Sequence, residues 1–201
     1  MGYSVTYLVL APSALQAPAV EEDESLVERL RRGEPTAVGE AYDHHHAAVR
    51  AFAQRLVGEA ATAEDLVHEV FVALPRASRN FRGESSLRTF LISIAVHHAH
   101  HHVRSATRRR AAFSRLEREP SAEVSADPEA IARRKELAQA LTRALDTLPI
   151  DQRVAFILCE VEERSSRDVA EIVGVPEGTV RTRLFHAKRK LREELEREGF
   201  R

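Results

Sequence analysis

The most regularly spaced chemical groups of the chain are basic side chains in its last quarter. Six Lys and Arg residues follow one another here with no acidic residue between them: Arg181, Arg183, Lys188, Arg189, Lys190 and Arg192. Apolar residues recur between them at three- and four-residue intervals, as on one face of a helix: Val180, Leu184, Ala187, Leu191 and Leu195. A helix that buries this stripe presents its donors on the other side, as reading the major groove of DNA requires. We predict a DNA-contacting set on it: Arg181, Thr182, Arg183, His186, Lys188 and Arg189.

The residues before this segment favour DNA binding over a basic helix that is merely solvated. Ser165 to Gly174 has the composition of a short capped helix that ends at a glycine, and Val175 to Gly178 is typical of a tight turn. A short helix, a tight turn and a longer helix make up the sequence pattern of a helix-turn-helix. The long helix, from Glu177 to about Glu198, is therefore predicted to be a recognition helix.

A second polar surface is predicted on a helix from Leu87 to about Arg104. One apolar stripe passes through Leu91 and another through Val96, so this helix should be buried between neighbours and expose a narrow strip. The side chains of that strip are polar: Thr89, Ser93, His97, His100 and Arg104. An arginine run that includes Arg108 follows. Strip and run together have the layout of a surface that follows a nucleic-acid backbone, although such a run is also typical of a solvated linker.

Histidine is abundant, with ten in the chain. The pairs His97/His101 and His98/His102 have the spacing at which two imidazoles on one helix can share a metal ion. The glutamate of the zinc-protease pattern His-Glu-x-x-His is missing, however. We expect no metal and no other cofactor. His97 and His100 are interpreted as hydrogen-bonding groups on a nucleic-acid surface, whose charging in mild acid would alter binding.

A third helix is predicted to open at Thr62, which with Asp65 resembles a capping box, and to kink or end at Pro75. Its first two turns hold Glu64, Asp65 and Glu69. Carboxylates in that position interact favourably with the helix dipole, which explains them without any further role.

Catalysis finds little support in the sequence. Gly83 and Gly174 stand alone rather than in a phosphate-binding loop, and no nucleophile, base and orienting group can be assembled. The single cysteine, Cys159, excludes an internal disulfide framework. We expect a protein that is not an enzyme.

The elements that must position these surfaces are helical. Of 201 residues, 43% are apolar, 30% are charged and only eight are glycine, which favours an all-α chain of two small helical domains over a sandwich or barrel. Leu26, Val27 and Leu30 share one helix face before Gly33, and a further helix is predicted from Thr36 to Val57.

The predicted organisation has four parts. Residues 1–22 form a disordered extension, with a single added strand as the alternative; 23–105 form the first domain; 106–128 form a flexible linker with no sustained period; 129–201 form the second domain. No apolar run approaches the length of a membrane span, and the start lacks the positive charge of a secretory signal. The expected location is the cytoplasm.

Three segments resemble motifs of bacterial sigma factors, in the same order and spacing. They are Ala63–Phe71 (Ala-Glu-Asp-Leu-Val-His-Glu-Val-Phe), Phe81–Ala95 with Arg-Gly-Glu-Ser-Ser at its start, and Gly174–Leu191 with Thr-Val-Arg-Thr-Arg inside it. The similarity covers about residues 23–198 and is to the extracytoplasmic-function group of the sigma-70 family. It implies a region 2 domain and a region 4 helix-turn-helix domain with no region 3 domain between them. It also implies binding to core RNA polymerase and to promoter DNA, and an anti-sigma factor as a further partner.

The resemblance also implies roles for particular residues. The segment that docks on the clamp helices of the polymerase largest subunit corresponds to Glu64, Asp65, His68 and Glu69. The loop that captures a flipped base of the −10 element corresponds to Asn80, Arg82, Ser85 and Ser86, and the polar strip with Arg108 faces the melting −10 strand. The helix that reads the −35 element corresponds to the DNA-contacting set from Arg181 to Arg189.

This chain departs from the family pattern at Phe90, where tryptophan is common, and at His97 and His186, where asparagine and arginine are usual. Two other classes of function stay open on the sequence alone. One is a repressor or activator that binds duplex DNA without polymerase, and the other is a metal-sensing protein that uses the histidine cluster.

Overall fold

The structure, a computed structural model, describes residues 20–83, 85–113 and 128–200; within them, the side chains of 20–24, 100, 101, 103–113, 128–132, 134 and 135 lie outside the description. Every element in these ranges is helical, so the predicted all-α fold is confirmed. The helices form two compact units, one built mainly of residues before Thr107 and the other mainly of residues after it.

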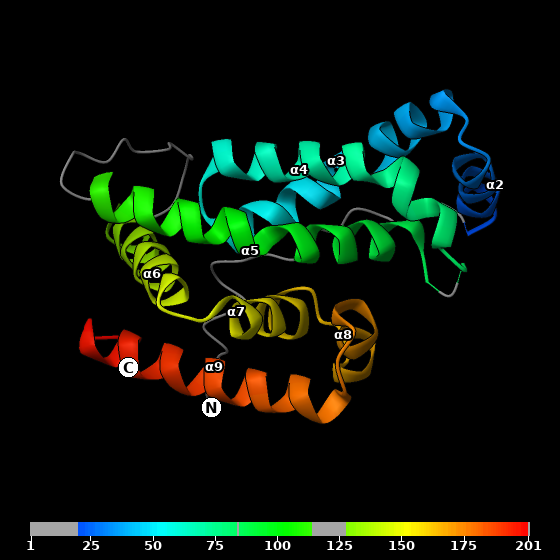
Figure 1. Ribbon diagram of the computed structural model, residues 1–201. Coiled ribbons are helices and arrows are strands. Elements are labelled where there is room, and N and C mark those ends of the chain that lie inside the picture. Colours follow the sequence, from blue (N-terminus) through cyan, green and yellow to red (C-terminus); the bar gives the residue numbers. More distant parts are fainter. Residues whose placement is uncertain (1–19, 84, 114–127, 201) are drawn as a thin grey trace. The chain divides into compact units, whose positions relative to one another are not determined.

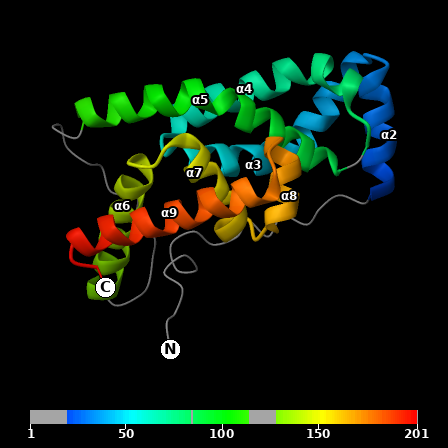
Figure 2. The same ribbon diagram turned by 60° about the horizontal axis from the view of Figure 1, so that its bottom comes forward.

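The first unit contains α2 (Val20–Arg31), α3 (Pro35–Val57), α4 (Ala60–Ala77) and α5 (Leu87–Phe113). Helix α4 packs along α3 and lies beside α5 (Figures 1 and 2). The core is mainly aliphatic, with Phe52, Phe71 and Phe81 buried in it, and includes fully buried Leu66, Leu91 and Ile92. Leu91 and Ile92 belong to different stripes of α5, so the prediction that this helix is buried on two faces is confirmed.

The start of α4 differs from the capping box predicted at Thr62. The helix begins at Ala60, and Glu59 is the N-cap, with an extended backbone. The Glu59 carbonyl accepts a hydrogen bond from Ala63 N–H at 2.9 Å, while the buried Thr62 hydroxyl donates to Glu59 Oε2 at 2.8 Å. The prediction that Thr62 opens the helix is therefore wrong. The chain turns earlier because Gly58, in the left-handed region at φ 71°, caps the end of α3.

The ends of three helices also differ from their predicted bounds. Helix α2 begins at Val20, inside the range predicted as an extension, and residues 1–19 lie outside the described part of the chain. Helix α4 continues past Pro75 to Ala77, followed by a short 3₁₀ turn, η1 (Ser78–Asn80). Helix α5 continues beyond Arg104 to Phe113, into the range predicted as a linker, of which 114–127 is not described.

The second unit contains α6 (Pro128–Asp146), α7 (Ile150–Phe156), a π-helical turn η2 (Ile157–Val161), α8 (Ser166–Val173) and α9 (Glu177–Arg197). Helix α9 packs against α7 and α6, burying the predicted stripe at Val180, Ala187 and Leu191. In the same unit, the almost fully buried side chain of Arg153 has Nη1 3.2 Å from Asp146 Oδ1. This carboxylate supplies the counter-charge that a charge removed from water needs.

Candidate nucleic-acid and polymerase surfaces

Local features of the sequence set the start of α8 and the turn that follows it. Ser165 Oγ accepts from Asp168 N–H at 3.1 Å, and Asp168 Oδ2 accepts from Ser165 N–H at 3.3 Å, which is the reciprocal capping box that opens α8. Gly174, at φ 68°, ends the helix in a conformation that side chains other than glycine rarely adopt. Pro176 is the N-cap of α9. The predicted succession of short helix, tight turn and long helix is confirmed.

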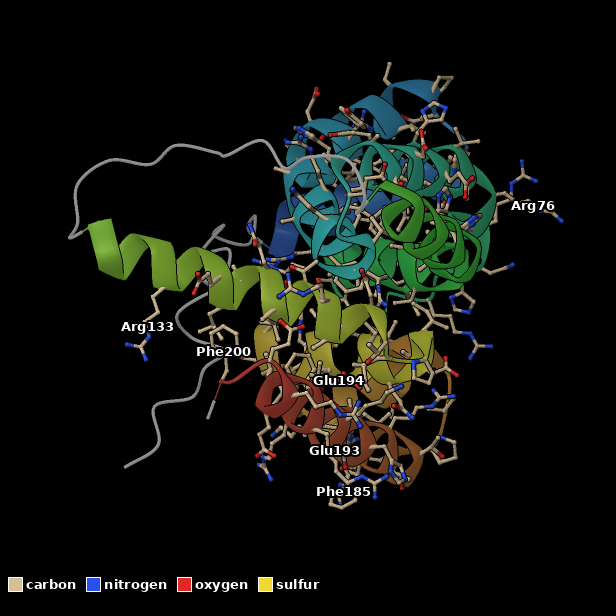
Figure 3. All side chains as sticks on the ribbon, turned by 90° about the vertical axis from the view of Figure 1, so that its left-hand side faces the viewer. Arg76, Arg133, Phe185, Glu193, Glu194 and Phe200 are labelled. Atoms are coloured by element: carbon tan, nitrogen blue, oxygen red, sulfur yellow. The ribbon has the colours of Figure 1, made fainter. Side chains whose placement is uncertain are left out.

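The outward face of α9 carries the side chains best placed to meet DNA. Arg181, Thr182 and Arg189 are exposed and His186 is half-buried. The Thr182 hydroxyl donates to the Gly178 carbonyl at 2.9 Å, so its oxygen keeps acceptor capacity toward a partner. Phe185, 63% exposed, projects from the same face (Figure 3) and packs edge-on against the His186 ring, with centroids 5.6 Å apart.

The flanks of α9 have different partners. Arg183 Nη2 lies 3.0 Å from Asp151 Oδ2 in the first turn of α7. Lys188 Nζ lies 2.7 Å from Glu160 Oε1 in η2. Two members of the predicted DNA-contacting set, Arg183 and Lys188, are thus engaged within the protein.

The loop before α5 exposes polar side chains next to a pair of stacked phenylalanine rings. Asn80, Arg82 and Ser85 are exposed. Between them Phe81 is buried and stacks on Phe90, with centroids 4.3 Å apart and planes inclined by 21°. The Phe81 carbonyl accepts a hydrogen bond of 2.8 Å from Arg31 Nε, which ties the loop to α2.

Ser86 caps α5 rather than projecting freely from this loop. Its Oγ accepts from Thr89 N–H at 3.2 Å and lies 3.0 Å from Thr89 Oγ1, so the two hydroxyls share one hydrogen bond. Farther along the strip, Ser93 donates to the Phe90 carbonyl at 2.7 Å. The polar strip therefore begins with hydroxyls that are already oriented by the helix.

His97 has a defined tautomer when neutral. Its Nδ1 lies 2.7 Å from the Ser93 carbonyl, which can only accept, so the proton is on Nδ1. The ring is exposed and presents Nε2 as an acceptor when neutral and as a donor when protonated. The remaining predicted residues of the strip, His100, Arg104 and Arg108, have side chains outside the described part of the structure.

The acidic face of α4 divides into exposed residues and one that is held inside the unit. Glu64, Asp65 and His68 are exposed, and Glu64 forms an ion pair with Arg50 of α3. Glu69 Oε2 instead accepts from His98 Nδ1 at 3.1 Å, and it lies 3.0 Å from His102 Nε2. Its predicted partner is the polymerase, but in the structure it joins α4 to α5.

The two histidines set the ionisation of Glu69. Partial burial alone would raise the pKa of this carboxyl, but hydrogen bonds and charge from His102, and then from His98, outweigh it, so that the pKa is lowered. His98 is half-buried, and its ring is turned to Glu69.

Two apolar side chains at the surface of this unit were not predicted as site residues. Val72 is 66% exposed and follows His68 by one helical turn. Tyr42 is exposed in α3, stacks on His46 at 4.8 Å and contacts Phe71 edge-on at 4.9 Å. Val72 lies outside the apolar stripe of its helix, and that mismatch is the signal from which the sequence could have indicated it. Figure 3 shows Arg76, one further turn along α4, also pointing away from the helices.

Neither a metal centre nor a membrane span is indicated by the residues that the structure describes. Among them, no three or more His, Cys, Asp and Glu side chains are arranged to hold an ion, and Glu69 meets His98 through a hydrogen bond and His102 through an ion-pair contact. Helices in the described ranges are too short or too polar to cross a bilayer.

The single cysteine, Cys159, is not set up as a reactive group. Burial raises the pKa of the Cys159 thiol, as does the neighbouring Glu160, and a raised pKa disfavours the reactive thiolate.

Comparison with known proteins identifies both units. The family described as Sigma-70 region 2 matches residues 41–109, and Sigma-70, region 4 matches residues 138–191. The RNA polymerase sigma-H factor of Pseudomonas aeruginosa is 32% identical over 192 residues, covering 88% of this chain and 95% of that protein. The ECF RNA polymerase sigma-E factor of Escherichia coli K12 is 31% identical over 182 residues, covering 83% and 90%.

A solved structure supports the same relationship. The sigma factor RpoE from Bartonella quintana, in complex with the anti-sigma factor NepR, is 28% identical with a TM-score of 0.53, covering 75% of this chain and 91% of that one. CnrH, in complex with the cytosolic domain of CnrY, has a TM-score of 0.56 at 21% identity and thus shares the fold.

A helix-turn-helix unit preceded by a helical region 2 unit defines a sigma factor, and the chain belongs to the sigma-70 family. Within that family it belongs to the extracytoplasmic-function group of RNA polymerase sigma factors. Proteins of this class bind core RNA polymerase and direct it to promoters, where transcription begins. The resemblance found in the sequence is thereby confirmed.

Proposed function

We propose that this sigma factor divides promoter recognition between the two surfaces described above. The observation that carries this proposal is the outward face of α9, where Arg181, Thr182, His186 and Arg189 lie opposite the buried stripe and directly after a tight turn. A helix in this setting presents its N-terminal half to base edges in the major groove. These four side chains read the −35 element.

The loop and polar strip of the first unit act on the −10 element. Asn80, Arg82 and Ser85 are exposed beside Phe81, which stacks on Phe90, so a base that leaves the duplex finds polar groups at the edge of a stacked aromatic pair. Ser86 and Thr89, at the start of α5 beside this loop, hold each other in place through their shared hydrogen bond. Captured bases exchange stacking in the duplex for contacts with protein, at a few kcal/mol per base.

The strip then guides the opened strand. Ser93 and His97 follow the loop along α5, and we assign His100, Arg104 and Arg108 to the same path from their sequence positions. His97 offers a base an acceptor when neutral and a donor when protonated, because Nδ1 is bound to the Ser93 carbonyl.

Core polymerase docks on the exposed face of α4. Glu64, Asp65 and His68 supply charge and polarity there, and Val72 supplies the apolar contact that a docking surface needs at its centre. Glu69 contributes by holding α4 against α5 through His98 and His102.

The domain bounds, the cellular location and a further partner complete the proposal. Residues 23–105 and 129–201 are the functional domains, joined by 106–128, and the protein acts in the cytoplasm without catalysis of its own, because the polymerase forms the bonds. The complex of the B. quintana relative with NepR supports an anti-sigma factor as a further partner.

Transcription from a promoter tests the −35 assignment. Core polymerase and the full chain are incubated with duplexes that carry a selected −35 element or a scrambled one, and run-off product is measured. Arg181→Ala is expected to reduce the preference for the selected element by a factor that corresponds to about 1–3 kcal/mol. Equal losses on both duplexes would show that Arg181 does not read bases.

A further inference from the structure

Among the described side chains, three polar bridges connect α9 to the preceding elements of its unit. On one flank, Arg183 Nη2 lies 3.0 Å from Asp151 Oδ2, and Lys190 Nζ donates to the Thr147 carbonyl at 2.6 Å. On the other flank, Lys188 Nζ lies 2.7 Å from Glu160 Oε1. The partners come from three places in the chain: the corner after α6, the first turn of α7, and η2.

The bridges lie on opposite sides of the buried stripe. With 3.6 residues per turn, Arg183 and Lys190 lie roughly 60–80° to one side of the line through Val180, Ala187 and Leu191, and Lys188 lies roughly 80° to the other. Thr182 and Arg189 are on the far side of the helix. Apolar contacts resist withdrawal of a helix from its groove and any rotation large enough to expose Val180 or Ala187. They oppose smaller rotations only weakly, because they have no direction. The hydrogen bonds of Arg183 and Lys190 on one flank and the ion pair of Lys188 on the other oppose rotation in either sense.

We propose that Arg183 and Lys188 are positioning residues that fix the rotation of α9 about its own axis and thereby decide which side chains enter the DNA groove. This inference rests on the proposed reading of the −35 element by α9. Even a rotation too small to expose the buried stripe would move Thr182 and Arg189 away from the centre of the groove and bring their neighbours toward it. The bridges therefore act on specificity more than on affinity.

The environment of the two bases supports positioning over phosphate contact. The Arg183 side chain is only 26% exposed, and Asp151 lies against its guanidinium. Lys188 is more exposed, at 49%, but faces Glu160. A phosphate would have to displace a carboxylate that is already in place, and it would be repelled by that carboxylate. Arg181 and Arg189, by contrast, pair only with Glu177 and Glu193 of their own helix among the contacts described.

The test uses holoenzyme reconstituted from core RNA polymerase and the full chain. A −35 duplex is first selected from a library randomised at that element, and binding is then measured on the selected and scrambled duplexes over a range of salt concentrations. The variants are Arg183→Met, Asp151→Asn and their combination, with Lys188→Met and Glu160→Gln as the second pair. Arg192→Met, which removes an exposed base from the same helix, is the matched control. Thermal unfolding of each variant sets a temperature at which all are folded.

Positioning predicts that the acid and the base of each pair behave alike. Asp151→Asn and Arg183→Met should each lower the ratio of selected to scrambled binding roughly 3- to 10-fold, and the double variant should lose no more than the worse single variant. The salt dependence should stay as in the wild type, whereas Arg192→Met should weaken both duplexes equally.

The opposite pattern would overturn the inference. If Arg183→Met weakens both duplexes alike and reduces the salt slope by about 0.9, Arg183 is a phosphate contact. Binding that is unchanged or tighter in Asp151→Asn leads to the same conclusion. If Arg181→Ala changes the ratio but none of the four pair variants does, α9 reads the element without this support. If the wild-type holoenzyme shows no preference for any −35 sequence, the proposed function itself fails and the inference fails with it.

Discussion

Replacing Glu69 by glutamine tests the connection between the α4 surface and the α5 surface. Glu69→Gln keeps the shape of the side chain and one acceptor oxygen but removes the charge that His98 and His102 approach at 3.1 and 3.0 Å. Because the pKa of Glu69 is lowered in the folded chain, the ionised carboxylate stabilises the fold. The variant should therefore be less stable at neutral pH.

The size of the effect follows from exposure. The Glu69 side chain is 45% exposed and the His102 side chain only 9%. The contacts of Glu69 with His98 and His102 are therefore intermediate between exposed ion pairs and buried ones. Exposed pairs contribute about 0.2–1 kcal/mol each, and solvent screening keeps the pairing with His98 at the lower end. We expect a total loss of about 1 kcal/mol, or about 2–4 °C in the midpoint of thermal unfolding for a chain of this length.

The dependence on pH distinguishes charge from packing. A carboxyl whose pKa is lowered on folding stabilises the protein above its unfolded-state pKa, about 4.3 for glutamate, and loses that contribution as pH falls through the folded-state value. The gap in unfolding midpoint between wild type and Glu69→Gln should be present at pH 7 and narrow steadily below about pH 4.3.

Calorimetric or circular-dichroism melting from pH 7.5 downward measures this gap, and Asp65→Asn, at an exposed carboxylate of the same helix, is the matched control. The control should melt close to the wild type throughout. A gap of constant size across the whole pH range would show that glutamine disturbs packing rather than charge. No gap at neutral pH would show that the contacts with His98 and His102 do not stabilise the unit.

Two further predictions concern the first unit. Val72→Asp should weaken binding to core polymerase by about tenfold or more while changing the unfolding midpoint by no more than a few degrees, because the side chain is largely exposed; a pull-down with equal affinity for variant and wild type would remove Val72 from the docking surface. Phe52→Ala should lower the free energy of unfolding by about 3–5 kcal/mol, because Phe52 is fully buried between α3 and its neighbours; a urea titration that shows a loss below 1 kcal/mol would mean that the site collapses around the smaller side chain.

Local sequence patterns were sufficient to predict the helical fold and the helix-turn-helix. Apolar spacing of three and four residues requires only that one face be buried, and Leu91, Val96, Val180 and Leu191 are all buried as that spacing predicts. The capping box at Ser165 also needed no tertiary information, because its partners are three residues apart. Local signals of this kind are complete within one turn of helix.

The first and last residues of the helices were predicted less well from the sequence. Thr62 has the residue type of an N-cap, but Gly58 in the left-handed region ends α3 early enough for Glu59 to take that position. Helix α5 continues to Phe113 although the apolar period fades after Val103, because helical hydrogen bonds continue wherever no residue breaks them.

The partners of the charged side chains were decided by the tertiary structure alone. The sequence places Arg183 and Lys188 among six similar bases, and Glu69 among three similar acids, with nothing local to distinguish them. Asp151, Glu160 and the histidines of α5 are many residues away. Which charge reaches which partner depends on how the helices pack, and the energy of an ion pair depends on a distance and a degree of burial that exist only in the folded chain.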